Sequence, residues 1–404
     1  MSLPRVFIRT LDGWRGIAIL PILAICTVSL LLTVGSIVFT VGQPIRDRDF
    51  LAYWTAGQQA AHHANPYDAK AVLALERSAG SNGMAVVMRN PPPAIMLVLP
   101  LGILPWRQAS LLWTGMLLAS FLASVQLLWT MLGKPSSSVL LLGCTFGPAL
   151  LCLCVGQTSL FMLLGVVLFL RFQSSQPFLA GASLWLCLLK PHLLLPFGVV
   201  VLACSLYTRR YSLLAGSGVA MISSTMIALY LDPGAWSHYA TMMTTSGIDQ
   251  EPIPSLGVAL RFALSPSLVW LQFVPAVAAC LWAGFYFSRH RDDWDWMQHG
   301  SVLLPVSLLV SPYAWSTDQA IVLPAILFVV ASTESREFMV AVALGSASME
   351  LAPLFGYGAH SHFYVLMALF WCSLSLLANR LHRAMRVNDP PPPAEGAAMM
   401  IENA

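Results

Sequence analysis

The residues best suited to chemistry lie in an acidic stretch from Arg46 to Asp49 that follows the first long apolar run. Only 10% of the chain is charged, so two carboxylates beside two guanidinium groups stand out. Phe50, Tyr53 and Trp54 follow at helical spacing, with the residue types of a membrane–water interface. A carboxylate such as Asp49 can act there as a general base toward an acceptor hydroxyl. It can also simply be the N-cap of the helix that begins after it.

Two further ionisable residues fall within apolar runs. Lys190 lies in the middle of the run from Phe178 to Tyr207, and His192 follows it after a proline. A lysine at membrane depth is a functional candidate that could meet a phosphate, or a cation that pairs inside the bundle. Asp318 enters a later apolar run after an aromatic turn, where it is either a site residue or a helix cap.

Polar donors also precede one proline-rich entrance to an apolar run. Arg89 and Asn90 stand directly before Pro91-Pro92-Pro93, where they could bind a lipid phosphate or only contact head groups. Gln157 is a weaker candidate, because an isolated glutamine is more often structural. The expected contacts to substrate and donor phosphate are Tyr53, Arg89, Asn90, Gln157, Lys190, His192 and Asp318.

The sequence gives little reason to expect a metal. All eight cysteines fall inside apolar runs without CxxC spacing, as small buried hydrophobes do. Asp47 and Asp49 form the Asp-x-Asp pattern that holds a metal in many nucleotide-sugar enzymes, but the α/β domain that normally carries it is missing. We therefore expect no metal and no other cofactor.

The elements that must position these residues are membrane helices. The hydrophobic fraction of 57% and a mean hydropathy of +0.72 are typical of an integral membrane protein. Apolar runs near the length of about 20 residues that a bilayer requires recur from residue 16 to residue 380. We expect an all-α polytopic domain of about twelve transmembrane helices over residues 1–388, and a flexible proline-rich tail over 389–404.

Basic residues predict the orientation of this bundle, whereas a net charge of +3 is too small to indicate nucleic acid. The expected outer loops are residues 42–91, with juxtamembrane helices up to His63 and over 69–79, and residues 232–266. The expected outer turns hold only Lys134 and Arg171. The expected cytoplasmic side, which includes both termini, holds Arg5, Arg9, Arg15, Arg107, Arg209, Arg210, Arg289, Arg291, Arg336, Arg380, Arg383 and Arg386. This predicts a multi-pass protein of the plasma (inner) membrane.

Short motifs occur in order over most of the chain: Asp49–Gly57, Asn65–Asp68, Pro91–Pro92, Gly156–Gln157, Leu189–His192, Trp236, Ser255–Leu256, Ser311–Tyr313 and Leu323–Pro324. In order and spacing they resemble glycosyltransferase family 87, a family of polyprenyl-phosphate-sugar-dependent hexosyltransferases in the GT-C superfamily. The resemblance implies a GT-C-like bundle. Two positions differ from the family pattern: Asn90 stands where an aromatic residue often precedes the prolines, and Thr317 where histidine is frequent.

The resemblance implies an inverting, metal-independent transfer of a hexose, mannose-like, from a polyprenyl-phosphate donor to a hydroxyl of a lipid or glycan. It assigns the general base to the first outer loop, which is Asp49 here. Lys190, Arg89 and His192 are then the candidates to stabilise the leaving phosphate at the outer face of the membrane. The residues alone leave another class open, a polytopic transporter or lipid-linked-saccharide flippase that uses Lys190 and Asp318. A non-catalytic scaffold is a third possibility.

Overall fold

The computed structural model describes residues 19–42, 49–247, 251–333 and 335–388, and regular structure within this part of the chain is entirely helical. The expected all-α architecture is confirmed in these residues. Arg46, Asp47 and Arg48 of the acidic stretch, the three N-terminal arginines and the proline-rich tail lie outside the described residues.

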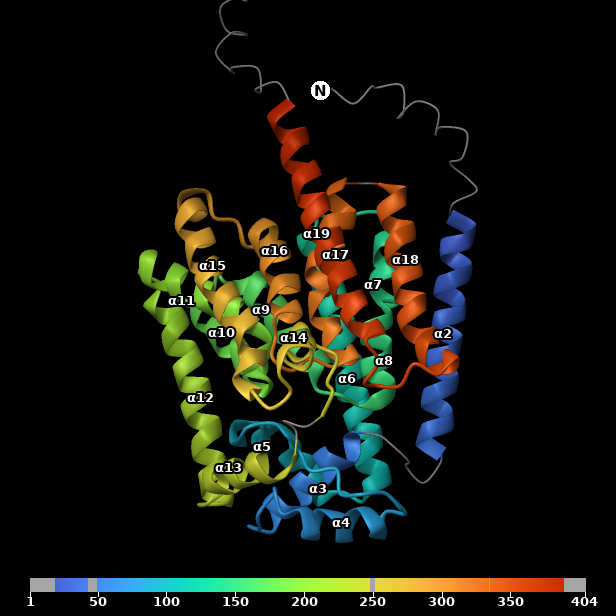
Figure 1. Ribbon diagram of the computed structural model, residues 1–404, viewed down its shortest axis with the longest axis vertical. Coiled ribbons are helices and arrows are strands. Elements are labelled where there is room, and N and C mark those ends of the chain that lie inside the picture. The colour runs from blue at the N-terminus through green and yellow to red at the C-terminus, as the bar shows by residue number, and fades with distance from the viewer. Residues whose placement is uncertain (1–18, 43–48, 248–250, 334, 389–404) are drawn as a thin grey trace, which may run out of the picture.

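A bundle of apolar helices forms the larger part of the molecule (Figure 1). Seven helices of the described residues are long and apolar enough to cross a membrane. They are Trp106–Met131 (α6), Ser137–Val155, Tyr211–Leu231 (α12), Val269–Asp293, Ser316–Thr333, Arg336–Phe355 and Phe363–Leu381. The helices that lie in or extend these segments are α7 (Ser137–Cys144), α8 (Gly147–Val155), α15 (Val274–His290), η9 (Ser316–Val322), α17 (Leu323–Thr333), α18 (Arg336–Leu351) and α19 (Phe363–Asn388).

Other apolar helices are shorter, at 10–17 residues: Ile22–Val38 of α2 (Ile19–Gly42), Pro92–Ile103, Ser159–Phe172 (α9), Pro177–Leu189 and Pro191–Tyr207. The expected count of about twelve spans is not confirmed. Several apolar runs that look continuous in the sequence break into short helices at prolines and glycines.

Short helices cover one end of the bundle, the lower end in Figure 1. The first loop forms α3 (Phe50–Ala61) and α4 (Ala69–Ser78), as predicted for juxtamembrane helices. The second loop adds α13 (Ala235–Thr245), and α14 (Leu256–Leu264) follows beside the bundle. We call this the α3 end.

The segment Pro92–Ile103 (η2, α5 and η3) packs on α3 and does not run to the other end of the bundle. Backbones touch where Gly57 of α3 meets Gly102: a Cβ built on Gly102 would lie 2.0 Å from the carbonyl oxygen of Gly57. Trp54 also donates from Nε1 to the carbonyl oxygen of Leu104 over 3.0 Å. The chain thus enters α6 at the α3 end, so the prediction that Arg107 lies on the opposite side is wrong.

The run around Lys190 is broken as expected, but it turns back on itself. It comprises α10 (Pro177–Ser183), η4 (Leu184–Leu189), η5 (Pro191–Leu194) and α11 (Leu195–Tyr207). Gly216 of α12 contacts the backbone of Phe178, and Arg210 donates to the carbonyl oxygen of Gln173 over 2.8 Å. Both ends of the run therefore lie at the same end of the bundle, with Lys190 at its deep turn.

Two basic residues expected in outer turns, Lys134 and Arg171, lie instead at the end of the bundle opposite the α3 end. Arg171 lies at the end of α9, next to the Arg210–Gln173 contact, and Lys134 follows α6 near the turn between α15 and α16 (Trp296–Leu309). The helix connections away from the α3 end hold Lys134, Arg171, Arg209, Arg210, Arg289, Arg291 and Arg336 (Figure 1).

Candidate active site

Asp49 occupies the N-cap position of α3 but does not cap the helix. Its carboxylate accepts no hydrogen bond from the backbone amides of α3. Asp68 shows the contrast, because its carboxylate caps α4 by accepting from the amides of Lys70 and Ala71. The capping explanation of Asp49 is therefore not borne out by its side chain, which turns toward the bundle instead.

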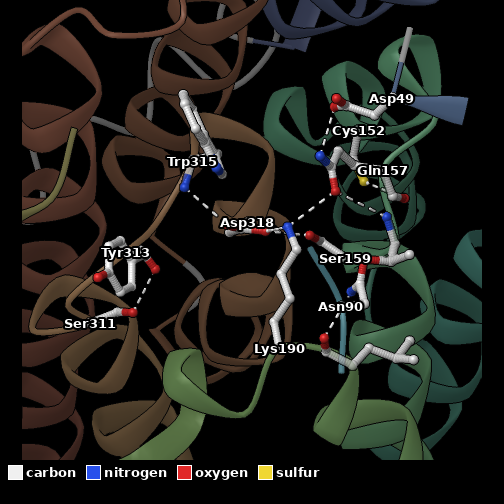
Figure 2. A network of polar contacts seen from close by, with 12 residues as sticks. Asp49, Asn90, Cys152, Gln157, Ser159, Lys190, Ser311, Tyr313, Trp315 and Asp318 are labelled. Atoms are coloured by element: carbon white, nitrogen blue, oxygen red, sulfur yellow. Dashed lines mark hydrogen bonds and ion pairs between the residues drawn. The ribbon is translucent and has the colours of Figure 1, made fainter. Parts of the chain in front are cut away.

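The partner of Asp49 is Gln157, whose Nε2 donates to Oδ2 of the carboxylate over 2.6 Å (Figure 2). Gln157 follows Gly156, which ends α8 in the left-handed conformation with φ of +84°. Trp113 of α6 holds the turn by donating from Nε1 to the carbonyl oxygen of Gly156 over 2.7 Å. A side chain at Gly156 would press on Phe50, so the glycine lets this turn approach the start of α3.

The amide oxygen of Gln157 gathers two more groups. It accepts from the hydroxyl of Tyr53 at 3.0 Å and from Nζ of Lys190 at 3.1 Å. A lysine ammonium can only donate, so the oxygen of the amide must face Lys190 and the nitrogen must face Asp49. Four side chains that the sequence analysis named separately, Asp49, Tyr53, Gln157 and Lys190, are thus brought together at one amide. Figure 2 shows Asp49, Gln157 and Lys190 of this group.

Asp318 lies on the far side of Lys190, with 2.7 Å between Nζ and Oδ1. Ser159 donates to the same oxygen over 2.5 Å, and the backbone amide of Trp315 donates to Oδ2 over 2.9 Å. The side chain of Asp318 is 1% exposed, whereas that of Lys190 is 12% exposed. Asp318 lies at the third position of η9 and stabilises the start of that helix by accepting from the backbone amide of its N-cap residue, Trp315. It also holds the lysine by an ion pair.

The two carboxylates differ in what they can do. Asp318 is buried and accepts from three donors, which leaves it little capacity to take a proton. Asp49 is partly exposed and has one hydrogen bond within the described residues. Burial raises the pKa of the Asp49 carboxyl above its ordinary value, and the hydrogen bond from Gln157 opposes that rise. Of the two, Asp49 is the one that can serve as a base near neutral pH.

Tyr53 completes this part of the site from α3. Its side chain is buried, and burial raises the pKa of its hydroxyl well above the ordinary value. The hydroxyl is therefore neutral and acts as a donor to Gln157. The ring also packs on Trp113, with 4.9 Å between centroids, which fixes the start of α3 against α6.

Three expected contacts lie outside this network. Arg89 forms an ion pair with Glu251 of the second loop, and both side chains are about one-third exposed, at 36% and 28%. Asn90 is buried and donates to the carbonyl oxygen of Leu189 over 2.8 Å. The ring of His192 meets that of Tyr313 edge to face, with 5.8 Å between centroids.

The structure nevertheless explains why Asn90 lies near the site. Tyr67, from the motif after α3, donates from its hydroxyl to the carbonyl oxygen of Asn90 over 3.0 Å. Asn90 in turn holds Leu189, the residue before Lys190. A chain of hydrogen bonds thus ties the first loop to the turn that carries the lysine.

Sequence reasoning missed Ser159 and Glu251. Ser159 stands two positions after Gln157, at the start of an apolar helix, where a serine is unremarkable. For Glu251 the sequence offers only a negative charge, opposite to the positive charge of Arg89. Both matter because of partners distant in the chain, which no local pattern gives.

Comparison with known proteins places this geometry in context. The sequence model of the family described as glycosyltransferase family 87 matches residues 89–312, more than half of the chain. This region includes Gln157, Ser159 and Lys190, whereas Asp49 precedes it and Asp318 follows it. No curated protein and no solved structure matched the chain.

Proposed function

The chain belongs to glycosyltransferase family 87, and from this premise we propose that it transfers a mannose-like hexose from a polyprenyl-phosphate donor to a hydroxyl of a lipid or glycan acceptor. Membership of the family supports a sugar transferase with a sugar donor and an acceptor. The identity of the hexose, the lipid carrier and the absence of a metal from the reaction are parts of the proposal.

In this mechanism Asp49 is the general base. Its carboxylate takes the proton of the acceptor hydroxyl as that oxygen forms a bond to the anomeric carbon of the donor. The bond from that carbon to the phosphate oxygen breaks at the same time, and the polyprenyl phosphate leaves with the electron pair. A single displacement inverts the anomeric configuration. General-base assistance of this kind contributes about 10²–10⁴-fold in rate.

The observation that carries this assignment is the turn of the Asp49 carboxylate away from its own helix and toward Gln157, at 2.6 Å. A carboxylate at a helix N-cap normally accepts from that helix. Asp49 gives up this stabilisation, whereas Asp68 keeps it. Polar residues placed against the local structural rule are frequently functional.

Negative charge develops on the phosphate as it leaves, so cations must lie near it. Lys190 is the nearest described cation to the Asp49–Gln157 pair, since it shares the same amide. Arg89 also acts on the Asp49 carboxyl by its charge, and His192 follows Lys190 by two positions. We propose that Lys190 and Arg89 bind the phosphate, with His192 at the edge of that site.

The distribution of basic residues supports an outer-face site in the plasma membrane, with both termini in the cytoplasm. The connections away from the α3 end carry seven lysines and arginines, from Lys134 to Arg336. The α3 end carries Lys70, Arg77, Arg89 and Arg107. By the positive-inside rule the end with more basic residues is cytoplasmic, which supports a site at which Asp49 faces outward. This orientation also suits a donor whose tail lies in the bilayer.

The test compares Asp49→Asn with Asp68→Asn in proteoliposomes that contain a polyprenyl-phosphate hexose and a hydroxyl acceptor. Asp49→Asn is expected to fold and to lose sugar transfer, because an amide cannot take the proton. Asp68→Asn is the matched control, since asparagine also caps a helix, and it should keep full activity. Full transfer by Asp49→Asn would discard the assignment. Movement of labelled donor across sealed vesicles without new glycosidic product would instead favour a flippase.

A further inference from the structure

Gln157 stands between the proposed base and the cation, and this arrangement, which rests on the proposed function, carries a more specific role. We propose that Gln157 is the positioning residue of Asp49, and that the Lys190–Asp318 ion pair fixes the direction in which its amide points. Lys190 then acts on the base through Gln157, in addition to any contact with the donor phosphate.

The first step of the argument is the polarity of the amide. Lys190 and the hydroxyl of Tyr53 both direct donors at Oε1 of Gln157, at 3.1 and 3.0 Å. Rotation of the amide by 180° would set its N–H group against the ammonium of Lys190. Only one orientation is therefore compatible with the lysine, and in it Nε2 faces Asp49.

The second step concerns which oxygen of Asp49 reacts. Nε2 of Gln157 donates to Oδ2 of Asp49 over 2.6 Å, and Oδ1 of Asp49 has no hydrogen-bond partner among the described residues. The amide thus holds the carboxylate in one rotamer and leaves Oδ1 as the proton acceptor. Loss of the amide N–H would release the carboxylate to rotate, and could let it cap α3 as Asp68 caps α4.

The third step is the position of the ion pair. Asp318 and Asp49 are both acceptors, so they are linked only through the donors Lys190 and Gln157 that lie between them. Ser159 and the amide of Trp315 hold both oxygens of Asp318, so the lysine has a rigid anchor. Asp318 thus fixes the position of the Lys190 ammonium, and the ammonium fixes the orientation of the Gln157 amide. The amide in turn fixes the rotamer of Asp49.

The charges that face Asp49 decide the expected pH effect. Among the described residues these are Lys190 and Arg89, which favour its ionised form, and Asp318, which disfavours it. Tyr53 faces it as a neutral phenol. The hydrogen bond from Gln157 also favours the ionised form. Replacing that donor by an acceptor should therefore make Asp49 harder to ionise.

The experiment measures transfer against pH for Gln157→Glu and Gln157→Asn in proteoliposomes with a polyprenyl-phosphate hexose. Glutamate keeps acceptors for Tyr53 and Lys190 but adds negative charge and, when ionised, cannot donate to Asp49. We expect kcat to fall about 10–100-fold, within the contribution of a general base, and the acidic limb of kcat to move to higher pH. Asparagine keeps both groups on a shorter stem, so its loss should be smaller.

Two further variants separate the possible roles. Lys190→Met should move the acidic limb to higher pH in the native background. If the lysine acts through the amide, the shift should be smaller when Gln157 is already changed to Asn, whereas an effect of its charge alone would be the same in both backgrounds. Gln58→Glu, whose amide on α3 contacts the carbonyl oxygen of Leu104, is the control and should leave the limb in place.

The outcomes overturn different statements. If the acidic limb of kcat is unchanged in both Gln157 variants, whatever the fall in kcat or in folded yield, Gln157 has only a structural role. That result would overturn this inference. The proposed function would survive that result if Asp49→Asn is inactive. Transfer by Asp49→Asn would remove the proposed function itself.

Discussion

Gln157 donates from Nε2 to Oδ2 of Asp49 over 2.6 Å, although the two residues are 108 positions apart in the chain. One comes from a short helix at the end of the bundle, and the other from a glycine turn between two apolar helices. The contact joins the part of the chain outside the bundle to its interior. The Lys190–Asp318 ion pair lies beside this contact, and an ionisable pair at that depth is a functional candidate.

The pH dependence of sugar transfer should report the ionisation of Asp49. Burial raises the pKa of this carboxyl above its ordinary value. A base works only when ionised, so transfer should fall as pH falls through that raised pKa, at a higher pH than for an exposed aspartate. The measurement is kcat/KM against pH in proteoliposomes of constant lipid composition. An acidic limb at the pH of an ordinary exposed carboxylate would contradict the assignment.

Removal of one partner of the Lys190–Asp318 ion pair should destabilise the bundle. Asp318→Asn leaves the ammonium without the opposite charge of its ion pair. Lys190→Met leaves a buried carboxylate held only by Ser159 and a backbone amide. Each change is expected to cost about 3–5 kcal/mol, because it leaves a buried charge uncompensated. The free energy of unfolding, measured by thermal or chemical denaturation of the protein in detergent, tests this prediction.

Two comparisons make this prediction specific. The double variant Lys190→Met with Asp318→Asn removes both charges and should be more stable than either single variant. Asp292→Asn changes an exposed carboxylate 3.9 Å from Arg291 and should stay within about 1 kcal/mol of the native protein. Equal stability of the native protein, the two single variants and the double variant would show that the pair contributes little.

The sequence predicted much of the fold and several site residues, for reasons that are local. Apolar runs of sufficient length identify α6 and α12, and the proline–glycine breaks identify α3 and α4 as separate short helices. Asp49 and Lys190 stood out because charges are rare in this chain. Their types and neighbours were enough to single them out.

What the sequence could not give is the set of partners. Whether Pro92–Ile103 crosses a membrane depends on the contact of Gly57 with Gly102, which no hydropathy pattern contains. The run around Lys190 turns back because α10 packs on α12, a contact between distant segments. Gln157 appeared weak because its importance lies in three contacts made at once.

The ion pair between Arg89 and Glu251 should compete with the donor phosphate for Arg89. If Arg89 binds that phosphate, Arg89→Met should raise the KM for the donor, whereas Glu251→Gln should lower it by freeing the guanidinium. Both side chains are partly exposed, so neither change should alter the free energy of unfolding by more than about 1 kcal/mol. Donor titrations at low and high salt measure the effect, which salt should weaken. An unchanged KM for the donor in both variants would exclude Arg89 from the donor site.

The backbone contact between Gly57 and Gly102 should be as important to activity as a residue of the site itself. A Cβ at Gly57 would lie 2.4 Å from the carbonyl oxygen of Val98 and 3.0 Å from the amide nitrogen of Gly102. Backbone atoms cannot move aside as a flexible side chain can, so Gly57→Ala must shift α3. We expect a loss of about 1–3 kcal/mol in stability from this overpacking.

The same shift should reduce transfer, because α3 carries Asp49 and the 2.6 Å contact to Gln157 tolerates little displacement. Gly115→Ala is the matched control: it lies within α6, nothing is within 4 Å of its built Cβ, and alanine favours a helix. That variant should fold at least as well as the native protein and transfer sugar at the native rate. If Gly57→Ala behaves as Gly115→Ala does, α3 is not held in place by this contact, and the position of Asp49 must depend on Gln157 and the aromatic packing of Tyr53 instead.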